Sequence, residues 1–565
     1  MDCSNNNYFP HIAKKEVLLV FLAGFVFRLL VSLQGADGVD VGFCNVFYQV
    51  IFTQPDSNVF NFIYYLTGIV GGTWELICGQ YGLLGFRLLE ALVLSGAIAM
   101  LYVTFRHWMP LRSSLIAIGI SFIFPLLSVT FHYDTLSYLL ITLSAFAFSR
   151  SLSGHQAWWL MVSGIMITLA IAARIVNATL LILLVIPFAY YLKQGEKRQA
   201  VYSSLWMFSG VLTGALLVLC LMLSLGHLEY YIAALGEAFG TFNSADATHS
   251  RGYLVWKFFH GYQNILLQAF PIFGIAYLWK LACQKLHGTT QTVAQSVLAI
   301  GFGVLAYTSP PYTTLMGFCF LVCFFGMYKS FLQEKEGAVV VFLLTAMFVF
   351  PFGSDIGAQG IFNWCVGLLV FPAVYSIGRC KNTWLQRGMF VAFASIALAA
   401  LVRTSVKVYG DRGPRYKCIY MLQPERLNIF TEKERSVAAQ HVIAQILRYT
   451  SENHLMLLIN QQSELYYATR TIPFLGHTQP LVYLGSRMDE RLNERLSHFG
   501  MYPTVVFLKQ EHDTSETPDV KMAVEQWMSQ HHYQVACDDD FCIIYVKQAG
   551  GVRDAVPDTK RRASQ

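Results

Sequence analysis

Charged residues are scarce in this sequence. Asp, Glu, Lys and Arg make up 13% of its 565 residues, whereas soluble domains carry roughly 25%. Together with 55% hydrophobic residues, this deficit excludes an ordinary soluble globular domain. The net charge of +6 is modest, and in a membrane protein it mainly reflects basic cytoplasmic loops. The composition therefore indicates no nucleic-acid partner.

The cysteine and histidine spacings of a metal site are also lacking. Twelve cysteines are scattered, mostly within apolar stretches, and none forms a CxxC or Cys/His pattern. Cys537 and Cys542 flank the acidic turn Asp538–Asp540 of a predicted hairpin. In an oxidising compartment they are candidates for a cross-hairpin disulfide. No EF-hand spacing follows the acidic turn, which argues against a calcium site.

What the sequence does have is recurring runs of about 20 apolar residues, each long enough to cross ~30 Å of hydrocarbon. A helix satisfies its own backbone groups in lipid, so these runs predict a polytopic α-helical membrane protein with about thirteen transmembrane helices. The approximate spans are 15–34, 83–105, 112–130, 135–150, 157–173, 176–192, 201–225, 261–281, 291–308, 312–328, 337–352, 361–378 and 386–403.

Lysine and arginine cluster in every second connection between the spans. By the positive-inside rule these connections and the N-terminus are cytoplasmic, and everything after about Arg403 lies outside the cytoplasm. The segments 34–82 and 226–260 then become outer loops. An Asn177-Ala-Thr sequon beside a span fits a bacterial inner membrane better than the endoplasmic reticulum. We therefore expect an inner-membrane protein whose C-terminal part is periplasmic.

The composition changes at about residue 406, where charge rises and the long apolar runs stop. Predicted strands alternate with predicted helices from there to residue 548, which indicates a small α/β domain. Residues 549–565 have the composition of a disordered tail. The expected division is a membrane domain at 1–405, an extracytoplasmic α/β domain at 406–548 and the tail.

Two carboxylates, Asp37 and Asp40, follow the first span and begin the outer loop 34–82. A carboxylate at a membrane surface is a candidate general base, because partial desolvation raises its pKa towards the working range. It is equally a candidate ligand for a divalent metal ion that bridges a phosphate. The alternative is a solvated turn, since ADGVD is a turn-like string. The aromatic helices predicted after it would bracket a lipid headgroup or simply pack in the aromatic belt.

Asp134 is a second candidate carboxylate, at the outer start of a later span in FHYDTLSYLLITLSAF. It would face the same site, with His132 and Tyr133 beside it. The alternative is a helix N-cap, which stabilises a helix by ~1 kcal/mol.

Basic residues on the predicted outer side are candidates to bind a lipid phosphate. Arg87, Arg174, Arg251 and Lys257 are these groups, and His249 lies in the same 226–260 loop as the last two. Arginine offers a bidentate fork to phosphate. The alternative for each residue is pairing with anionic lipid headgroups.

The sequence resembles the GT-C superfamily of membrane glycosyltransferases, in the branch that holds protein O-mannosyltransferases and the aminoarabinose–lipid A transferase. The resemblance rests on VDVGFCNVFYQ, YGLLGFRLLEALV, FHYDTLSYLLITLSAF and GIMITLAIAARIVNATLLILL, and on their order, over about residues 15–400. It implies a catalytic carboxylate in the first outer loop, for which Asp40 matches best and Asp37 is the reserve. It also implies a second acidic position at Asp134 and basic positions at Arg87 and Arg174.

The activity that this resemblance implies is inverting sugar transfer from a polyprenyl-phosphate sugar to a lipid, glycan or protein acceptor. A divalent metal ion, held by Asp40 and Asp134, is one way to stabilise the departing phosphate. Two other classes of function stay open. One is a transporter or flippase for a lipid-linked saccharide, which would show repeated halves and ionisable residues at mid-membrane. The other is a non-catalytic subunit of envelope glycan assembly.

Overall fold

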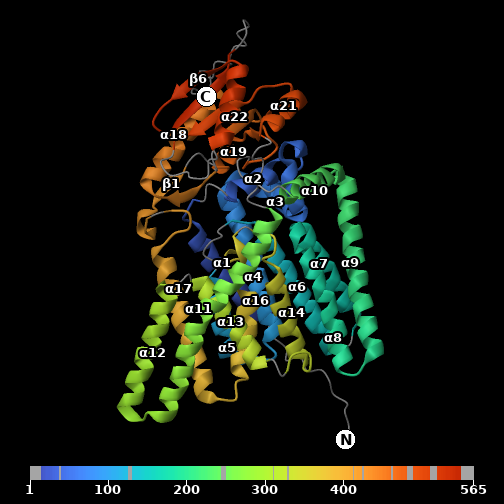
Figure 1. Cartoon of the computed structure of the whole chain (residues 1–565), viewed down its shortest axis with the longest axis vertical. Helices are drawn as coiled ribbons and strands as arrows, with labels where there is room; N and C mark the ends of the chain where they lie inside the picture. The colour runs from blue at the N-terminus through green and yellow to red at the C-terminus, as the bar shows by residue number, and fades with distance from the viewer. Residues whose placement is uncertain are drawn as a thin grey trace.

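The computed structural model describes residues 14–36, 40–124, 130–154, 156–243, 250–308, 311–327, 330–354, 356–411, 413–422, 426–459, 462–479, 488–509 and 518–548. A bundle of long helices forms one end of the molecule, and an α/β part made of the last residues caps the other (Figure 1). We refer to the end of the bundle that meets this part as the capped end.

Each predicted span overlaps a helix or consecutive helices of the bundle. These are α1 (Lys14–Ser32), α4 (Leu83–Phe105), α5 (Leu111–Ile123), α6 (Tyr133–Gly154), α7 (Trp158–Ala173), η3 (Ile175–Leu184), α8 (Val185–Lys193), α9 (Lys197–Leu225), α11 (Arg251–Lys285), α12 (Gly288–Thr308), α13 (Pro311–Met327), α14 (Lys335–Val349), α15 (Gly357–Phe362), α16 (Gly367–Gly378) and α17 (Thr383–Val406). Six described segments are long and apolar enough to cross a membrane: α4, α6, η3 with α8, α9, α11 and α17.

Small residues let the helices next to the candidate site pack closely. A side chain at Gly164 of α7 would collide with the carbonyl of Met207 on α9, and one at Gly210 would collide with Met161. Small residues are typical of helix contacts in membrane proteins. In lipid the hydrophobic effect does not drive apolar helices together, so their association depends on close packing. α7 is thereby held close against α9.

The sequence-based prediction for residues 226–260 is wrong in one respect, because most of this segment is helical. α10 (Leu228–Asn243) lies across the capped end (Figure 1), and α11 already begins at Arg251. Arg251 and Lys257 are therefore residues of a long helix and not of a loop. Four of the polar residues that suggested a loop lie in helices, Glu229 and Glu237 in α10 and Arg251 and Lys257 in α11.

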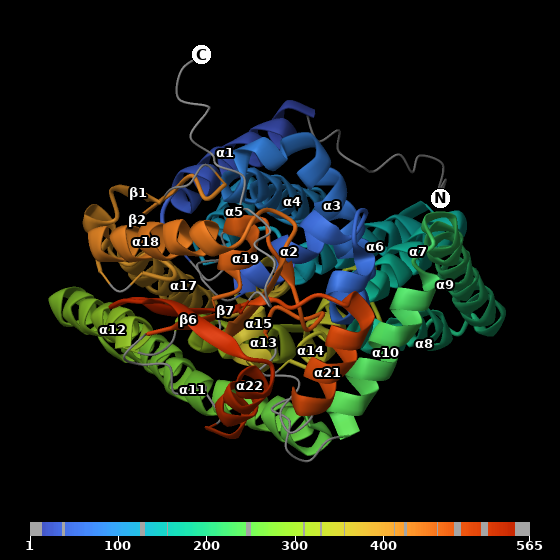
Figure 2. The same ribbon diagram turned by 90° about the horizontal axis from the view of Figure 1, so that it is seen from above.

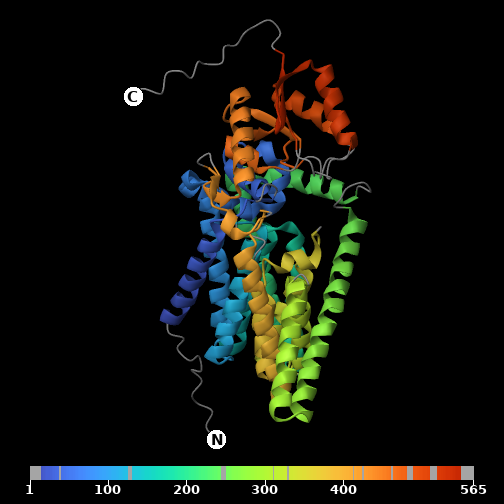
Figure 3. The same cartoon turned by 90° about the vertical axis from the view of Figure 1, so that its left-hand side faces the viewer.

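The segment 34–82 forms a layer between the bundle and the α/β part (Figure 3), and α2 lies beside α19 in the view from above (Figure 2). It contains α2 (Asp40–Val50), η1 (Pro55–Tyr64), α3 (Tyr65–Cys78) and η2 (Gly79–Tyr81). Residues 41–48 are all buried, because α2 packs on α3 below and on the α/β part above. The aromatic residues that suggested interfacial helices are packed inside the protein.

The C-terminal α/β part is built on a five-stranded sheet in the order β4-β3-β5-β7-β6. β3 pairs in parallel with β4 and β5, and β7 pairs antiparallel with β5 and β6. A separate β1–β2 pair precedes it. The elements are β1 (Tyr420–Leu422), β2 (Ile429–Thr431), α18 (Lys433–Tyr449), β3 (Leu455–Ile459), α19 (Glu464–Thr469), β4 (Ile472–Pro473), α21 (Met488–Phe499), β5 (Thr504–Leu508), α22 (Pro518–Gln530), β6 (Tyr533–Asp538) and β7 (Cys542–Lys547). The predicted helical membrane protein with a small α/β part is confirmed.

The predicted disulfide between Cys537 and Cys542 is wrong, since both cysteines are free. The register of the β6–β7 hairpin pairs Cys537 with Ile544, two residues beyond Cys542. The turn is closed instead by Asp539, whose Oδ1 accepts hydrogen bonds from the backbone N–H groups of Phe541 and Cys542 at 2.9 and 3.0 Å.

Candidate functional site

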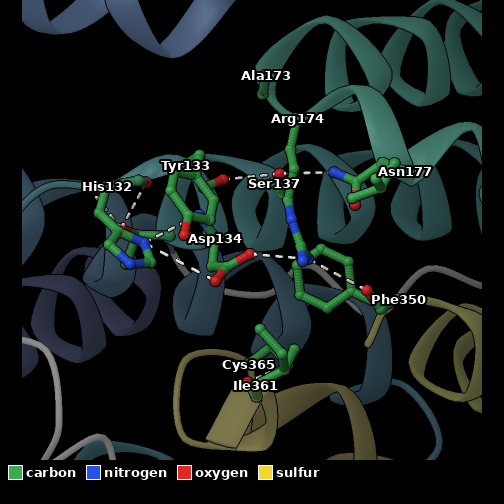
Figure 4. A network of polar contacts seen from close by, with 12 residues as sticks. His132, Tyr133, Asp134, Ser137, Ala173, Arg174, Asn177, Phe350, Ile361 and Cys365 are labelled. Carbon is green, nitrogen blue, oxygen red and sulfur yellow. Dashed lines mark hydrogen bonds and ion pairs between the residues drawn. The ribbon is translucent and has the colours of Figure 1, made fainter. Parts of the chain in front are cut away.

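A buried ion pair lies at the capped end of the bundle (Figure 4). Asp134 stands in the first turn of α6, and Arg174 at the junction of α7 and η3. Nη1 of Arg174 lies 3.2 Å from Oδ1 of Asp134 and donates to the carbonyl of Phe350, also at 3.2 Å. Charges are buried in proteins when they are paired in this way. The structure thus joins two residues that the sequence suggested separately.

The backbone around Arg174 explains why its side chain points inward. α7 ends at Ala173, and Arg174 adopts an extended conformation (φ −156°, ψ 111°) before η3 starts. Nδ2 of Asn177 donates to Ser137 Oγ and to the carbonyl of Ala170, both at 2.8 Å. The amide side chain gives the Ala170 carbonyl a second donor beside the backbone N–H of Arg174, and it ties η3 to α6 (Figure 4).

His132 is neutral and oriented by its neighbours. The N–H of Asp134 donates to His132 Nδ1 at 3.1 Å, so the ring proton is on Nε2. Burial and the nearby Arg174 charge lower the pKa of His132 to about 3. The ring stacks between Tyr133 and Trp364, with centroid distances of 4.3 and 4.2 Å. His132 Nε2 is therefore a fixed hydrogen-bond donor.

An aromatic stack links this ion pair to α2. Tyr133 stacks on Tyr64 of η1 at 4.1 Å between centroids, and Tyr64 meets Phe43 of α2 edge-on at 5.9 Å. Phe43 lies one turn after Asp40, the first residue of α2. The start of α2 and the Asp134–Arg174 pair therefore belong to one packed assembly at the capped end.

The structure describes only some of the other candidate residues in full. Asp37 and His249 lie outside the described residues, and of Asp40 only the backbone is described. Arg251 is the exposed first residue of α11. Lys257 is half-buried one to two turns later, with Nζ 5.8 Å from the centroid of the Tyr253 ring. The roles of these residues stay predictions.

Arg87 is fully buried and turned towards the end of α1. Its guanidinium donates to the carbonyls of Ser32, Gln34 and Gly35, which follow or end that helix. A cation near a helix C-terminus satisfies its last carbonyls and interacts favourably with its dipole. Arg87 thereby anchors the start of the 34–82 segment, and its predicted contact with a phosphate is untested.

The C-terminal part brings residues to this end that sequence reasoning missed. The ring of His477 packs on Phe60 of η1 and Phe43 of α2, at 4.8 and 5.9 Å between centroids. Arg426 pairs with Glu75 of α3. No local motif marks these residues, because their partners are hundreds of positions away in the sequence.

The described residues do not bring together a ready-made metal site. Within these ranges, no three His, Cys, Asp or Glu side chains gather in a way that could hold a metal ion. Asp134, one of the two predicted ligands, already faces Arg174. The side chain of the other, Asp40, is not among those described.

Comparison with known proteins gives distant structural similarities only. No protein-family model and no curated protein matches this sequence. A structure of ArnT from Cupriavidus metallidurans bound to undecaprenyl phosphate is similar, with 14% identity and a TM-score of 0.43, over 95% of this chain and 99% of that one. The Archaeoglobus fulgidus oligosaccharyltransferase in complex with Zn and sulfate is similar with 11% identity and a TM-score of 0.46, over 86% of this chain and 68% of that one.

The oligosaccharyltransferase AglB from Archaeoglobus fulgidus, in complex with an inhibitory peptide and a dolichol-phosphate, is similar with 10% identity and a TM-score of 0.43, over 88% of this chain and 69% of that one. At such values, the similarity by itself assigns neither a family nor a function to the chain.

Proposed function

We propose that the chain is an integral membrane glycosyltransferase that moves a sugar from a polyprenyl-phosphate donor to a hydroxyl group of an acceptor, with inversion. The observation that carries the proposal is the buried Asp134–Arg174 pair, packed through Tyr133 and Tyr64 against α2. It places polar groups at the end of a lipid-exposed bundle, where a membrane lipid and an extramembrane acceptor meet. The GT-C resemblance of the sequence supports the same reading.

The proposed chemistry uses a carboxylate at the start of the 34–82 segment as the general base. Asp40 is the first choice and Asp37 the second. The base accepts the proton of the acceptor hydroxyl while that oxygen forms a bond to the anomeric carbon. The bond between the anomeric carbon and the phosphate oxygen breaks, and the polyprenyl phosphate leaves with the electron pair. Attack from the opposite face inverts the configuration of the sugar.

The remaining polar groups are proposed to orient the reactants and to stabilise the leaving phosphate. Asp134 holds the guanidinium of Arg174 in place, and the Nε2–H group of His132 supplies a fixed donor. Preorganised donors of this kind stabilise charge that develops in the transition state without having to reorganise. Arg251 and Lys257 of α11 are proposed contacts of the phosphate before and after transfer.

The donor and the site of action follow from the same proposal. Undecaprenyl phosphate, the lipid bound in the ArnT structure, is the carrier that we choose to test first. A divalent ion held by Asp40 and Asp134 would add positive charge at the phosphate. The steps proposed above do not depend on such an ion. The proposed location is the bacterial inner membrane, with the α/β part in the periplasm.

The test is sugar release and transfer by the purified protein in lipid nanodiscs, with synthetic polyprenyl-phosphate sugars and a panel of lipid and glycan acceptors. Loss of a general base lowers kcat by roughly 10²–10⁴-fold, so we expect that loss for D40N or for D37N, but not for both. Asp538 is an exposed carboxylate of the hairpin turn, and D538N is the matched control. Unchanged transfer by D40N and by D37N would overturn the assignment of the base. Failure of the unmodified protein to consume any donor would overturn the transferase proposal.

A further inference from the structure

Arg426 of the C-terminal part joins three elements of the capped end. Its guanidinium pairs with Glu75 of α3, and its Nη1 donates to Oε1 of Gln49 on α2 at 2.7 Å. The same nitrogen donates to the carbonyl of Tyr467 in α19 at 3.1 Å. The guanidinium also lies over the Tyr467 ring, with Cζ 4.1 Å from its centroid. The hydroxyl of Tyr467 completes the group by donating to the second oxygen of Glu75 at 3.1 Å.

The backbone of Arg426 makes a further connection, to the beginning of α4. Its carbonyl accepts a hydrogen bond from the N–H of Leu83 at 2.8 Å. The preceding residue, Gly82, has a φ of +57°, and a side chain there would collide with the carbonyl of Arg426. Position 82 therefore requires glycine, which adopts a positive φ freely and leaves room for the backbone of Arg426.

A second close contact lies beside the candidate base. A side chain at Gly42 of α2 would collide with the backbone of Ser463 and Glu464, where α19 begins. Gly42 is two residues from Asp40. The C-terminal part therefore lies directly against the start of α2, and Gln49 on the same face of α2 carries the contact with Arg426.

We propose that Arg426 is a positioning residue that fixes the 34–82 segment, and with it the start of α2, beneath the C-terminal part. This inference rests on the proposed function for its catalytic consequence and on the contacts above for its structural one. The ion pair of Arg426 with Glu75 is largely shielded, since each side chain is 12% exposed. The planar guanidinium serves a carboxylate, an amide oxygen, a backbone carbonyl and an aromatic face together, which the point charge of a lysine does not reproduce.

The first experiment measures hydrogen exchange of the full-length protein in nanodiscs. R426Q should speed up exchange in α2, α3 and α19, because the free energy of local opening falls when the contacts between these elements are lost. The double variant R426E/E75R should restore protection in part. Arg470 also lies in the C-terminal part and pairs with Glu452 at an exposed site, so R470Q is the matched control and should behave like the unmodified protein. Unchanged protection of α2 in R426Q would overturn the proposal, whether or not the protein proves to be a transferase.

The second experiment measures kcat and KM for sugar transfer. A small displacement of a catalytic group costs up to about 100-fold in rate, so we expect R426Q to lower kcat on that order. The KM for the lipid donor should change by far less, and R426E/E75R should recover part of kcat. Faster exchange in α2 with an unchanged kcat would overturn the catalytic part of the proposal. An unmodified protein without transferase activity would instead count against the proposed function, and the exchange result would stand.

Discussion

The guanidinium of Arg174 lies 3.2 Å from the carboxylate of Asp134, and their side chains are only 5% and 1% exposed. The two residues are 40 positions apart and come from the ends of different helices. Their pairing joins a predicted catalytic carboxylate and a predicted phosphate contact into one unit, whose loss we expect to affect stability as well as activity.

Removal of one partner should destabilise the protein more than removal of both. R174Q leaves the carboxylate of Asp134 buried without its cation, and breaking a buried pair in this way costs about 3–5 kcal/mol. D134N/R174Q leaves no unpaired charge, so its cost should be well below the sum of the two single variants. Thermal unfolding of the four proteins in detergent provides the comparison. Strictly additive losses would show that the pair is not coupled.

Asn177 should not accept a glycan, although Asn177-Ala-Thr is a sequon. Its side chain is fully buried and donates two hydrogen bonds of 2.8 Å. Expression in a glycosylating eukaryotic cell should give a protein whose mass is unchanged by a glycosidase. N177A should lower stability by about 1–3 kcal/mol, since both hydrogen bonds of the buried amide side chain are lost. A sugar found on Asn177 would contradict the buried position.

Cys537 and Cys542 should both react as thiols. The structure has them free, with Cys542 buried and Cys537 half-buried. Intact-mass measurement after alkylation in denaturant should therefore count both as modified without prior reduction. Under native conditions we expect Cys537 to react first, because burial raises the pKa of Cys542 to about 12 and limits access to it. A mass that is two labels too low until a reductant is added would show that the two cysteines form a disulfide.

The β6–β7 hairpin should lose stability in acid through Asp539. Burial alone would raise the pKa of Asp539, but hydrogen bonds from His441 and from the N–H groups of Phe541 and Cys542 outweigh it and lower the pKa. A folded-state pKa below the ordinary value of 3.8 contributes stability above that pH, and the contribution is lost as the pH falls through the folded pKa.

D539N should therefore destabilise the protein most at neutral pH, and its difference from the unmodified chain should shrink below about pH 4. Calorimetric unfolding at a series of pH values measures this directly. D540N changes a neighbouring aspartate of the same turn and serves as the control. A difference for D539N that persists at low pH would mean that the carboxylate charge is not what stabilises the turn.

A reporter fused after Arg403 should appear outside the cytoplasm. The prediction follows from the alternation of basic connections along the chain. α17 ends at Val406 and the C-terminal part follows at once, so a reporter there also locates that part. A matched fusion in the basic connection near Lys197 should appear in the cytoplasm. Both reporters on one side of the membrane would contradict the predicted topology.

The bundle could be predicted from the sequence because its signals are local. Runs of apolar residues predict both ends of α4 correctly, and the ends of α9 and α17 to within four residues. The alternation of short apolar strands with amphipathic helices predicts the sheet of the C-terminal part for the same reason. α10 was not predicted, because its polar residues resemble a loop until their contact with α21 is known, where Arg491 meets Glu237 at 2.7 Å.

The candidate site was predicted only in part. The sequence pointed to Asp134 and Arg174 but gave no sign that they pair with each other, because pairing depends on how α6 and α7 pack. The sequence also gave no sign that Arg87 donates to the carbonyls that end α1. His477 and Arg426 were missed entirely, since a contact with a segment more than 350 residues away leaves no trace in local composition.

Arg426 and Glu75 are 351 positions apart in the sequence, so Glu75 is synthesised long before its partner. Ribosomes add roughly 5–20 residues per second, with the N-terminal parts folding first. The segments that carry Asp40, Asp134 and Arg174 are therefore made well before the C-terminal part exists. Until that part has been synthesised and has folded, α2 and α3 lack the contacts that cover them in the complete protein. A nascent chain thus carries its whole set of candidate catalytic residues in an unfinished state, and assembly becomes complete only near the end of translation.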